Sequence, residues 1–277
     1  MRKAFNNSIV SETKELFDHT GKTGDDFDQE TIHELRTHFK KIRALLRWQQ
    51  ANKRSYTFFK NIYEQAGKIR NIQVAQEILK NEAGIPEEFN NWLNAKLIYL
   101  KKEWHTGNKK KIERKLLQHF KKVKFAQHKK FFPCKMESIQ QIAGRKVISD
   151  TDMHQVRKEI KDIQYASEWW KKNTDAQVEV LKNIPVAKLK KIGIQIGNYN
   201  DKCTLINLFK IYLVVKKETV GENMLLKKWQ QEKAFFKQYL ADRIRHIQSR
   251  SIQFTRVSIM AAGVNEDGLQ LVEIPGS

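Results

Sequence analysis

The sequence predicts an all-α protein, and two observations carry that prediction. Apolar residues recur at intervals of three and four along most of the chain, the spacing that places them on one face of a helix. Only four prolines and 12 glycines interrupt the 277 residues, so few positions break a helix. The 40% of hydrophobic residues suffice for a packed core, in one large domain or in two small bundles that share it.

The first half of the chain is expected to hold several helices behind a polar leader. Residues 1–27 are predicted to be loosely attached, because the segment is polar and Gly21 and Gly24 interrupt any helix there. Asp28 can accept hydrogen bonds from the free N–H groups of a first turn, which predicts a helix start directly behind it. Pro133 is expected to close this half, residues 28–133. The helices expected in it cover about 28–51, 55–83, 87–104 and 109–130.

The second half, residues 150–250, is predicted to be helical in the same way. Asp150 and Asp152 can cap a helix that runs to about residue 172, and Pro185 precedes another helix. A long helix is expected from about residue 223 to 250. The helical domain is therefore predicted to span 28–250, and residues 251–277, which are mixed and contain glycine, are expected to form a tail.

The chain is strongly basic. Its 52 Lys+Arg against 31 Asp+Glu give a formal charge of +21, a balance that attracts nucleic acid, inorganic polyanions or anionic membrane surfaces. Cys134 and Cys203 are too few for a disulfide framework and do not have a zinc-like spacing, which fits a reducing cytoplasm. Neither a secretory signal nor an apolar run long enough to cross a membrane is found in the sequence, so no membrane insertion is expected.

A row of cations on the first helix is the most informative feature. A helix turns by about 100° per residue, so one histidine and four cations fall within a sector of roughly 80°. These residues are His33, Arg36, Lys40, Arg43 and Arg47, with Lys41 beside them. The only carboxylate between residues 33 and 47, Glu34, lies outside the row. A solvated helix face would usually alternate the signs of its charges, so the row favours a linear polyanion as its ligand.

The same pattern begins again 121 residues later, at His154. Arg157, Lys158, Lys161 and Tyr165 follow it. Two glycine-containing elements, at Gly67 and Gly197, are 130 residues apart, and Asn71 and Asp201 follow them at the same distance. Two landmarks in the same order and at similar spacing predict an internal duplication, with two helical bundles related by an approximate two-fold axis. The two cationic rows would then face one ligand across a basic groove.

These residues resemble the CHAD family, which is named for histidines on helices. The family pattern is a His-x-x-Arg helix with a basic pair, then a Leu-Gly-x-x-Arg-Asp-like element, both repeated in a second half. Here the first helix matches from His33 to Arg43, and residues 66–71 match the second element with Asn71 in place of Asp. The resemblance covers about 28–250. It implies an all-α protein of two bundles that binds inorganic polyphosphate in a basic groove.

The resemblance also implies which residues contact polyphosphate. They are His33, Arg36, Lys40, Lys41, Arg43, Arg47, Arg70, His154, Arg157, Lys158 and Lys161, with Tyr165, Asn71 and Asp201 in support. Arginines would donate paired hydrogen bonds to phosphate, lysines would act as point charges, and His33 would take up a proton beside phosphate, so that binding tightens toward pH 6. Asp162 and Gln164 stand where the family usually has cations, which predicts weaker binding by the second half.

Alternatives remain open for the supporting residues. Arg70 is as well explained by a carboxylate partner at a helix contact as by a phosphate. Asp201 is expected to orient an arginine or to bond a helix terminus. The ring of Tyr165 is expected in the core, with its hydroxyl pointing to the groove.

No enzymatic activity, cofactor or metal is predicted, because the sequence has no HExxH, Walker-type loop or nucleophile elbow. The alternative function is binding of RNA or DNA without sequence preference, for which six tryptophans can stack bases. Four of these tryptophans, however, occupy apolar helical positions: Trp48, Trp92, Trp169 and Trp170. Metal chelation by the histidines is a third interpretation. The expected location is the cytoplasm, at polyphosphate granules.

Overall fold

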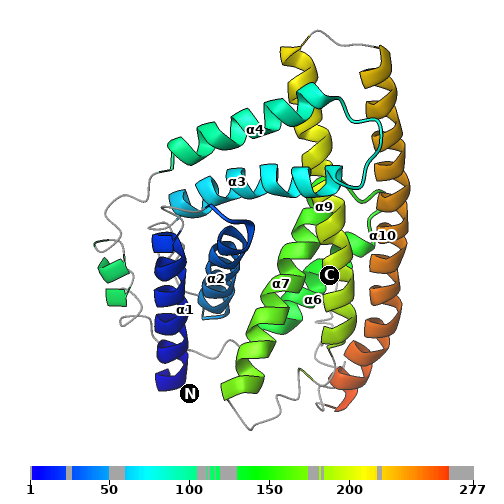
Figure 1. Cartoon of the computed structure of the whole chain (residues 1–277). Coiled ribbons are helices and arrows are strands. Elements are labelled where there is room, and N and C mark those ends of the chain that lie inside the picture. Colours follow the sequence, from blue (N-terminus) through cyan, green and yellow to red (C-terminus); the bar gives the residue numbers. More distant parts are fainter. Residues whose placement is uncertain are drawn as a thin grey trace, which may run out of the picture.

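The computed structural model describes residues 2–22, 27–49, 60–104, 111, 113–115, 117–118, 130–173, 181, 184–216 and 220–261. Regular structure in these ranges is helical and includes no strand, which confirms the all-α prediction. The helices are α1 (Arg2–Lys22), α2 (Gln29–Trp48), α3 (Lys60–Leu79), α4 (Glu87–Lys102), α6 (Phe131–Ala143), α7 (Asp150–Asn173), α9 (Val186–Val215) and α10 (Val220–Ala261) (Figure 1).

The prediction of a loosely attached leader is wrong, because α1 is a packed helix. Phe5, Ile9 and Leu16 leave at most 2% of their surface exposed. The ring of Phe5 packs edge-on against Trp169, with centroids 5.5 Å apart. These apolar residues recur at helical spacing in an otherwise polar segment, so composition hid a narrow buried stripe. Gly21 lies in the last turn of α1, where a glycine interrupts little.

The predicted start of α2 is confirmed. Oδ1 of Asp28 accepts from the N–H of Glu30 at 2.7 Å, and Oδ2 accepts from the N–H of Thr31 at 3.1 Å. These bonds satisfy two of the N–H groups that a helix leaves free at its start. The cap therefore fixes where the cationic row begins.

Two other boundaries differ from the predictions. Pro133 lies in the first turn of α6, where its missing N–H costs nothing, so it does not close the first half. At α7 the cap is Ser149: its hydroxyl accepts from the N–H of Asp152 at 3.1 Å, and the Asp152 carboxylate accepts from the N–H of Ser149 at 2.8 Å. The two residues form a reciprocal capping box one residue earlier than expected.

The C-terminal helix is longer than predicted. α10 extends past residue 250 to Ala261, so the predicted tail begins inside a helix. Residues 262–277 and most of the helix predicted at 109–130 lie outside the described residues.

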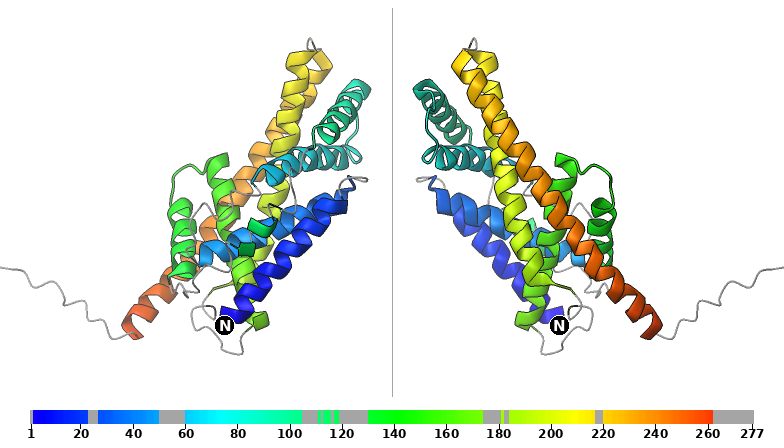
Figure 2. Two further views of the ribbon diagram at one scale, coloured as in Figure 1. Left: turned by 90° about the vertical axis from the view of Figure 1, so that its left-hand side faces the viewer. Right: turned by 90° about the vertical axis from the view of Figure 1, so that its right-hand side faces the viewer.

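The cationic helix α2 packs against α1, α3 and α7, and it lies between α1 and α7 in Figure 1. α7 packs in turn on α6 and α9, and α9 pairs with α10 in a long hairpin (Figure 2). α3 packs against α2, α4 and α9. The arrangement places α2, which carries His33, directly against α7, which carries His154.

The buried apolar residues form two clusters. The larger one joins α1, α2 and α7 to parts of α3, α6, α9 and α10, and the smaller one lies where α3, α4, α9 and α10 meet. Each cluster takes residues from both predicted halves, so the halves share their cores. Among the described helices, none combines the length and the apolar composition needed to cross a membrane.

Candidate functional site

The cations of α2 and α7 meet around one pocket of about 260 Å³. α2 supplies Lys40 and Arg43, and α3 supplies Tyr63. α7 supplies the rest of the lining, His154, Arg157, Lys158, Lys161, Asp162 and Tyr165. Residues more than a hundred positions apart in the sequence thus line one cavity, most of them positively charged.

Arg36 is held in place by Tyr63 on α3. Its Nη1 donates to the main-chain carbonyl of Tyr63 at 3.0 Å, its Nη2 donates to the Tyr63 hydroxyl at 3.4 Å, and its Cζ lies 4.4 Å from the ring centroid. Arg43 lies over the same ring, at 5.8 Å. One tyrosine therefore positions two arginines of the row, by hydrogen bonds and by cation–π attraction.

Tyr63 was missed in the sequence, although a signal was present. It lies four residues before Gly67 and therefore on the same face of α3. Phe39 of α2 stacks on its ring, with centroids 4.0 Å apart. The signal is an aromatic residue one helical turn before a glycine, on the face of α3 that packs against the cationic helix α2.

The two predicted glycines are the places where arginines approach a neighbouring helix. A Cβ atom at Gly67 would stand 2.5 Å from Nη1 of Arg36, and one at Gly197 would stand 3.3 Å from Nη2 of Arg157. The same contact thus occurs between α2 and α3 and between α7 and α9. A side chain at position 67 would force the guanidinium of Arg36 to move, whereas one at position 197 would require Arg157 to shift by only a few tenths of an ångström.

The charges of the two rows act on one another strongly at Lys40. Burial, together with the positive charges of Arg36, Arg157, Lys161 and Arg43, lowers the pKa of Lys40 to about 7. Burial likewise lowers the pKa of Arg36. Repulsion from Arg157, Arg70 and Arg43 also lowers this pKa, whereas Tyr63 raises it. Cations of α2, α3 and α7 therefore share one poorly compensated electrostatic site.

The two histidines that head the rows behave alike. Partial burial lowers the pKa of His33, and Arg70 and Lys40 add to the effect. Partial burial also lowers the pKa of His154, with Lys158, Arg157 and Arg43 contributing. Both imidazoles are therefore neutral at pH 7 in the ligand-free protein, and each has a side that reaches solvent.

Asp201 and Arg70 join this electrostatic site. Burial raises the pKa of Asp201, while Arg157, Arg70, Lys40 and Arg36 oppose that rise. Asp201 thus lies among cations of α2, α3 and α7, and its role in orienting an arginine stays a prediction. Within the described ranges Arg70 forms no ion pair at contact distance, although its charge acts on the Asp201 carboxylate.

Two predicted binding residues, Arg47 of the row and Lys41 beside it, are engaged elsewhere. Nη1 of Arg47 lies 2.9 Å from Oδ2 of Asp162, a carboxylate that is only 4% exposed and that also binds Nζ of Lys135 at 2.9 Å. Nζ of Lys41 turns toward α1 and lies 3.3 Å from Oε1 of Glu12. The sequence row seemed free of carboxylates because these partners come from other helices.

The remaining predicted residues differ in their position. Tyr165 lines the pocket under the ammonium of Lys161, which lies 5.6 Å from its ring centroid, and burial raises the pKa of its hydroxyl to about 12. Gln164 accepts from Lys161 at 3.0 Å. Asn71 is exposed on α3 and does not line the pocket.

The fold and this pocket define an all-α protein whose central helices gather cations around one cavity. The family model described as CHAD domain matches residues 11–210, and the chain therefore belongs to the CHAD family. The match begins inside α1, in agreement with the packing of that helix. CHAD domains are associated with polyphosphate binding in general. No curated protein and no solved structure matches the chain.

Proposed function

We propose that this chain binds inorganic polyphosphate, without catalysing a reaction, in a basic groove between α2 and α7. The observation that carries the proposal is the crowding of cations around Lys40, whose pKa is lowered to about 7 by burial and by arginines and lysine of both helices. Such crowding destabilises the ligand-free site, and a polyanion would relieve it.

The kinds of cation present suit a chain of phosphates. Arg36 and Arg43 are oriented over Tyr63 and can present a planar fork of donors to phosphate oxygens. Lys40, Lys158 and Lys161 add point charges that need no fixed geometry. His33 and His154, neutral without ligand, would gain a proton when phosphate oxygens come near.

An internal duplication belongs to the same proposal. The contact of Arg36 with Gly67 and that of Arg157 with Gly197 join equivalent helix pairs, α2 with α3 and α7 with α9. Two copies of one unit, placed face to face, would produce a groove with a cationic row on each wall. Such a groove fits an extended ligand better than a compact one.

The tryptophans favour polyphosphate over nucleic acid. Trp48, Trp169 and Trp170 are at most 7% exposed and pack against one another and against Phe5. Trp92 packs on the smaller apolar cluster. Single-strand binders use exposed aromatic rings as stacking platforms, and these four rings are used for packing instead. We also propose a location in the cytoplasm, where a fluorescent fusion would test recruitment to polyphosphate granules.

The deciding experiment is competition between two polyanions. Long-chain polyphosphate should displace a fluorescent oligonucleotide at a far lower phosphate concentration than the reverse, and Arg36→Gln should weaken polyphosphate binding about tenfold, because charge-assisted hydrogen bonds are lost. Arg245→Gln is the charge-matched control, since Arg245 lies on α10 and pairs with Asp242. If RNA competes equally well per phosphate, or if both variants lose the same affinity, the proposal is wrong.

A further inference from the structure

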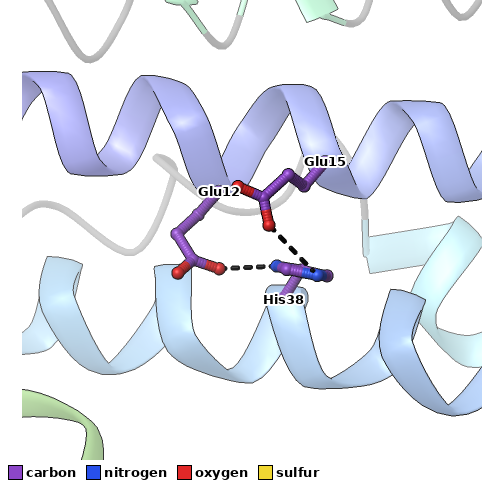
Figure 3. Close-up of side chains that lie close together, drawn as sticks. All are labelled: Glu12, Glu15 and His38. Carbon is purple, nitrogen blue, oxygen red and sulfur yellow. Dashed lines mark hydrogen bonds and ion pairs between the residues drawn. The ribbon is translucent and has the colours of Figure 1, made fainter. Parts of the chain in front are cut away.

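The contact between α1 and α2 contains a buried histidine held between two glutamates, His38 with Glu12 and Glu15 (Figure 3). The side chain of His38 is 10% exposed. Its Nδ1 lies 2.6 Å from Oε2 of Glu12, and its Nε2 lies 3.5 Å from Oε2 of Glu15. This cluster is on the α1 side of α2 and has no part in the proposed polyphosphate site.

The two distances suit different roles. At 2.6 Å Glu12 and Nδ1 share a short hydrogen bond, which fixes the ring and leaves the Nε2 lone pair available when Nδ1 carries the proton. The 3.5 Å between Nε2 and Glu15 is at the limit of a hydrogen bond. It is close to the roughly 3.4 Å that separates two ligands of a tetrahedral zinc ion with bonds of about 2.0–2.1 Å.

A second histidine–glutamate pair lies beside the first. Nε2 of His19 is 3.1 Å from Oε2 of Glu34, and the ring of His19 stacks on that of His38 with centroids 5.3 Å apart. Nδ1 of His19 is buried and has no hydrogen-bond partner among the residues described. Glu15 with His19 and Glu34 with His38 are each four residues apart, so both helices present a carboxylate and an imidazole on the facing surface.

We propose that His38 and Glu15 bind a divalent transition-metal ion of the zinc class, with Glu12 as the positioning residue that holds the imidazole. One ligand from each helix would fasten α1 to α2, and water would fill the remaining positions. An imidazole beside carboxylates suits zinc, cobalt or nickel, whereas magnesium and calcium prefer oxygen ligands alone. The proposal departs from the expectation, based on motifs, that the chain has no metal site.

The charges around the cluster set how tightly it would bind. Burial alone would raise the pKa of Glu12. Hydrogen bonding from His38 and the charge of Lys41 nevertheless hold this pKa below its usual range, so Glu12 is ionised. Three carboxylates, those of Glu12, Glu15 and Glu34, face the two imidazoles. Lys41, 3.3 Å from Glu12, is the cation that opposes a metal ion there.

The test is a calorimetric titration of the full-length, untagged chain with Zn²⁺, in the absence of polyphosphate. We expect one equivalent to bind and the melting temperature to rise. Glu15→Gln should weaken binding about tenfold or more. Lys41→Gln should strengthen it a few-fold, because it removes the opposing charge. Co²⁺ in place of Zn²⁺ should give the visible absorption of a tetrahedral site with a nitrogen ligand.

Three control variants separate this site from others. Glu64→Gln removes an exposed glutamate that pairs with Lys60 and should change nothing. His33→Ala tests the rival hypothesis that the metal ion binds at the cationic row, and this variant should bind Zn²⁺ like the parent. Glu12→Gln retains an acceptor for Nδ1 and should lose less affinity than Glu15→Gln.

The proposal fails if no stoichiometric Zn²⁺ binds, if Glu15→Gln binds as the parent does, or if His33→Ala abolishes binding. His38→Ala is not needed for this decision, since loss of a buried ring can unfold the chain.

Discussion

Arg36 of α2 lies so close to Gly67 of α3 that a Cβ atom at position 67 would stand 2.5 Å from its Nη1. The same guanidinium donates to the main-chain carbonyl of Tyr63, 3.0 Å away. It is therefore confined between the backbone of α3 and the other cations of the site. The role of Arg36 in the site therefore depends on its position, which α3 determines, as well as on its charge.

Gly67→Ala should weaken polyphosphate binding with little change in stability. The new methyl group displaces the guanidinium and breaks its bond to Tyr63, at a cost of about 1 kcal/mol, while alanine in place of glycine favours the helix by about as much. Gly197→Ala is the matched variant, and its effect on affinity should be smaller because the corresponding distance to Arg157 is 3.3 Å. Equal losses of affinity, measured by titration, would contradict this explanation.

Removing Arg36 should cost more affinity than removing Arg157. Arg36 is fixed by Tyr63, and the wall that carries Arg157 also carries the carboxylate of Asp162. Arg36→Gln and Arg157→Gln can be compared in titrations at several salt concentrations. Both should flatten the dependence of affinity on salt, since each removes a phosphate contact that releases counterions. A larger loss of affinity for Arg157→Gln would contradict this prediction and would mean that the cations of α7 contribute more to binding than those of α2.

Asp162→Asn should tighten polyphosphate binding and destabilise the fold. The buried carboxylate binds Arg47 and Lys135, each at 2.9 Å. Without its charge Arg47 becomes available to an anion near the pocket, whereas Lys135 keeps its ion pair with Glu159 at 2.6 Å. The lost ion pairs should lower the free energy of unfolding by about 1–3 kcal/mol, as measured in urea. Asp242→Asn, which frees the exposed Arg245, serves as the control. Unchanged affinity in Asp162→Asn would show that Arg47 cannot reach the ligand.

Stability and ligand affinity should respond to pH in opposite directions. The pKa of Lys40 in the folded chain is about 7 instead of 10.5, so the unfolded chain binds more protons between these values. The free energy of unfolding should therefore rise as pH increases from about 7 toward 10. Over pH 6 to 8 Lys40 loses its charge, and polyphosphate binding should weaken.

Lys40→Gln isolates this contribution to the pH dependence. In that variant both trends should flatten, whereas His33→Ala measures the histidine's share of the change in affinity. If Lys40→Gln keeps the full pH dependence of affinity and stability, Lys40 does not titrate in this range.

Phe5→Ala should destabilise the whole protein, although residue 5 is near the N-terminus. Its ring is fully buried against Trp48 and Trp169, and replacing such a ring leaves a cavity that costs about 3–5 kcal/mol. Urea unfolding followed by tryptophan fluorescence measures the loss. A loss below about 1 kcal/mol would mean that α1 is attached as loosely as its composition suggested.

Local rules predicted the helices well. The cap at Asp28 and the helix start after Pro185 depend on residues adjacent in sequence, and the structure has both. The spacing of His33, Arg36, Lys40 and Arg43 correctly placed a cationic stripe on one face. Such features need no knowledge of tertiary contacts, because capping and helical periodicity act within one or two turns.

What the sequence left open depends on contacts between helices. Arg47 fits the row by spacing and Lys41 lies beside it, yet their carboxylate partners, Asp162 and Glu12, come from α7 and α1. Tyr63 supports the row from α3. Helical periodicity indicates which face a residue occupies, but not which side chain of another helix it meets there.

The crowding of cations between α2 and α7 has a consequence for turnover. In the absence of a bound polyanion the folded chain retains the repulsion around Lys40. The Arg47–Asp162 pair and the apolar core hold α2 and α7 together against this repulsion. A ligand that binds only the folded state shifts the balance away from unfolded chains, which proteases remove. If polyphosphate is the ligand, the amount of this protein in a cell should follow the supply of polyphosphate, because unliganded chains unfold more often and are degraded.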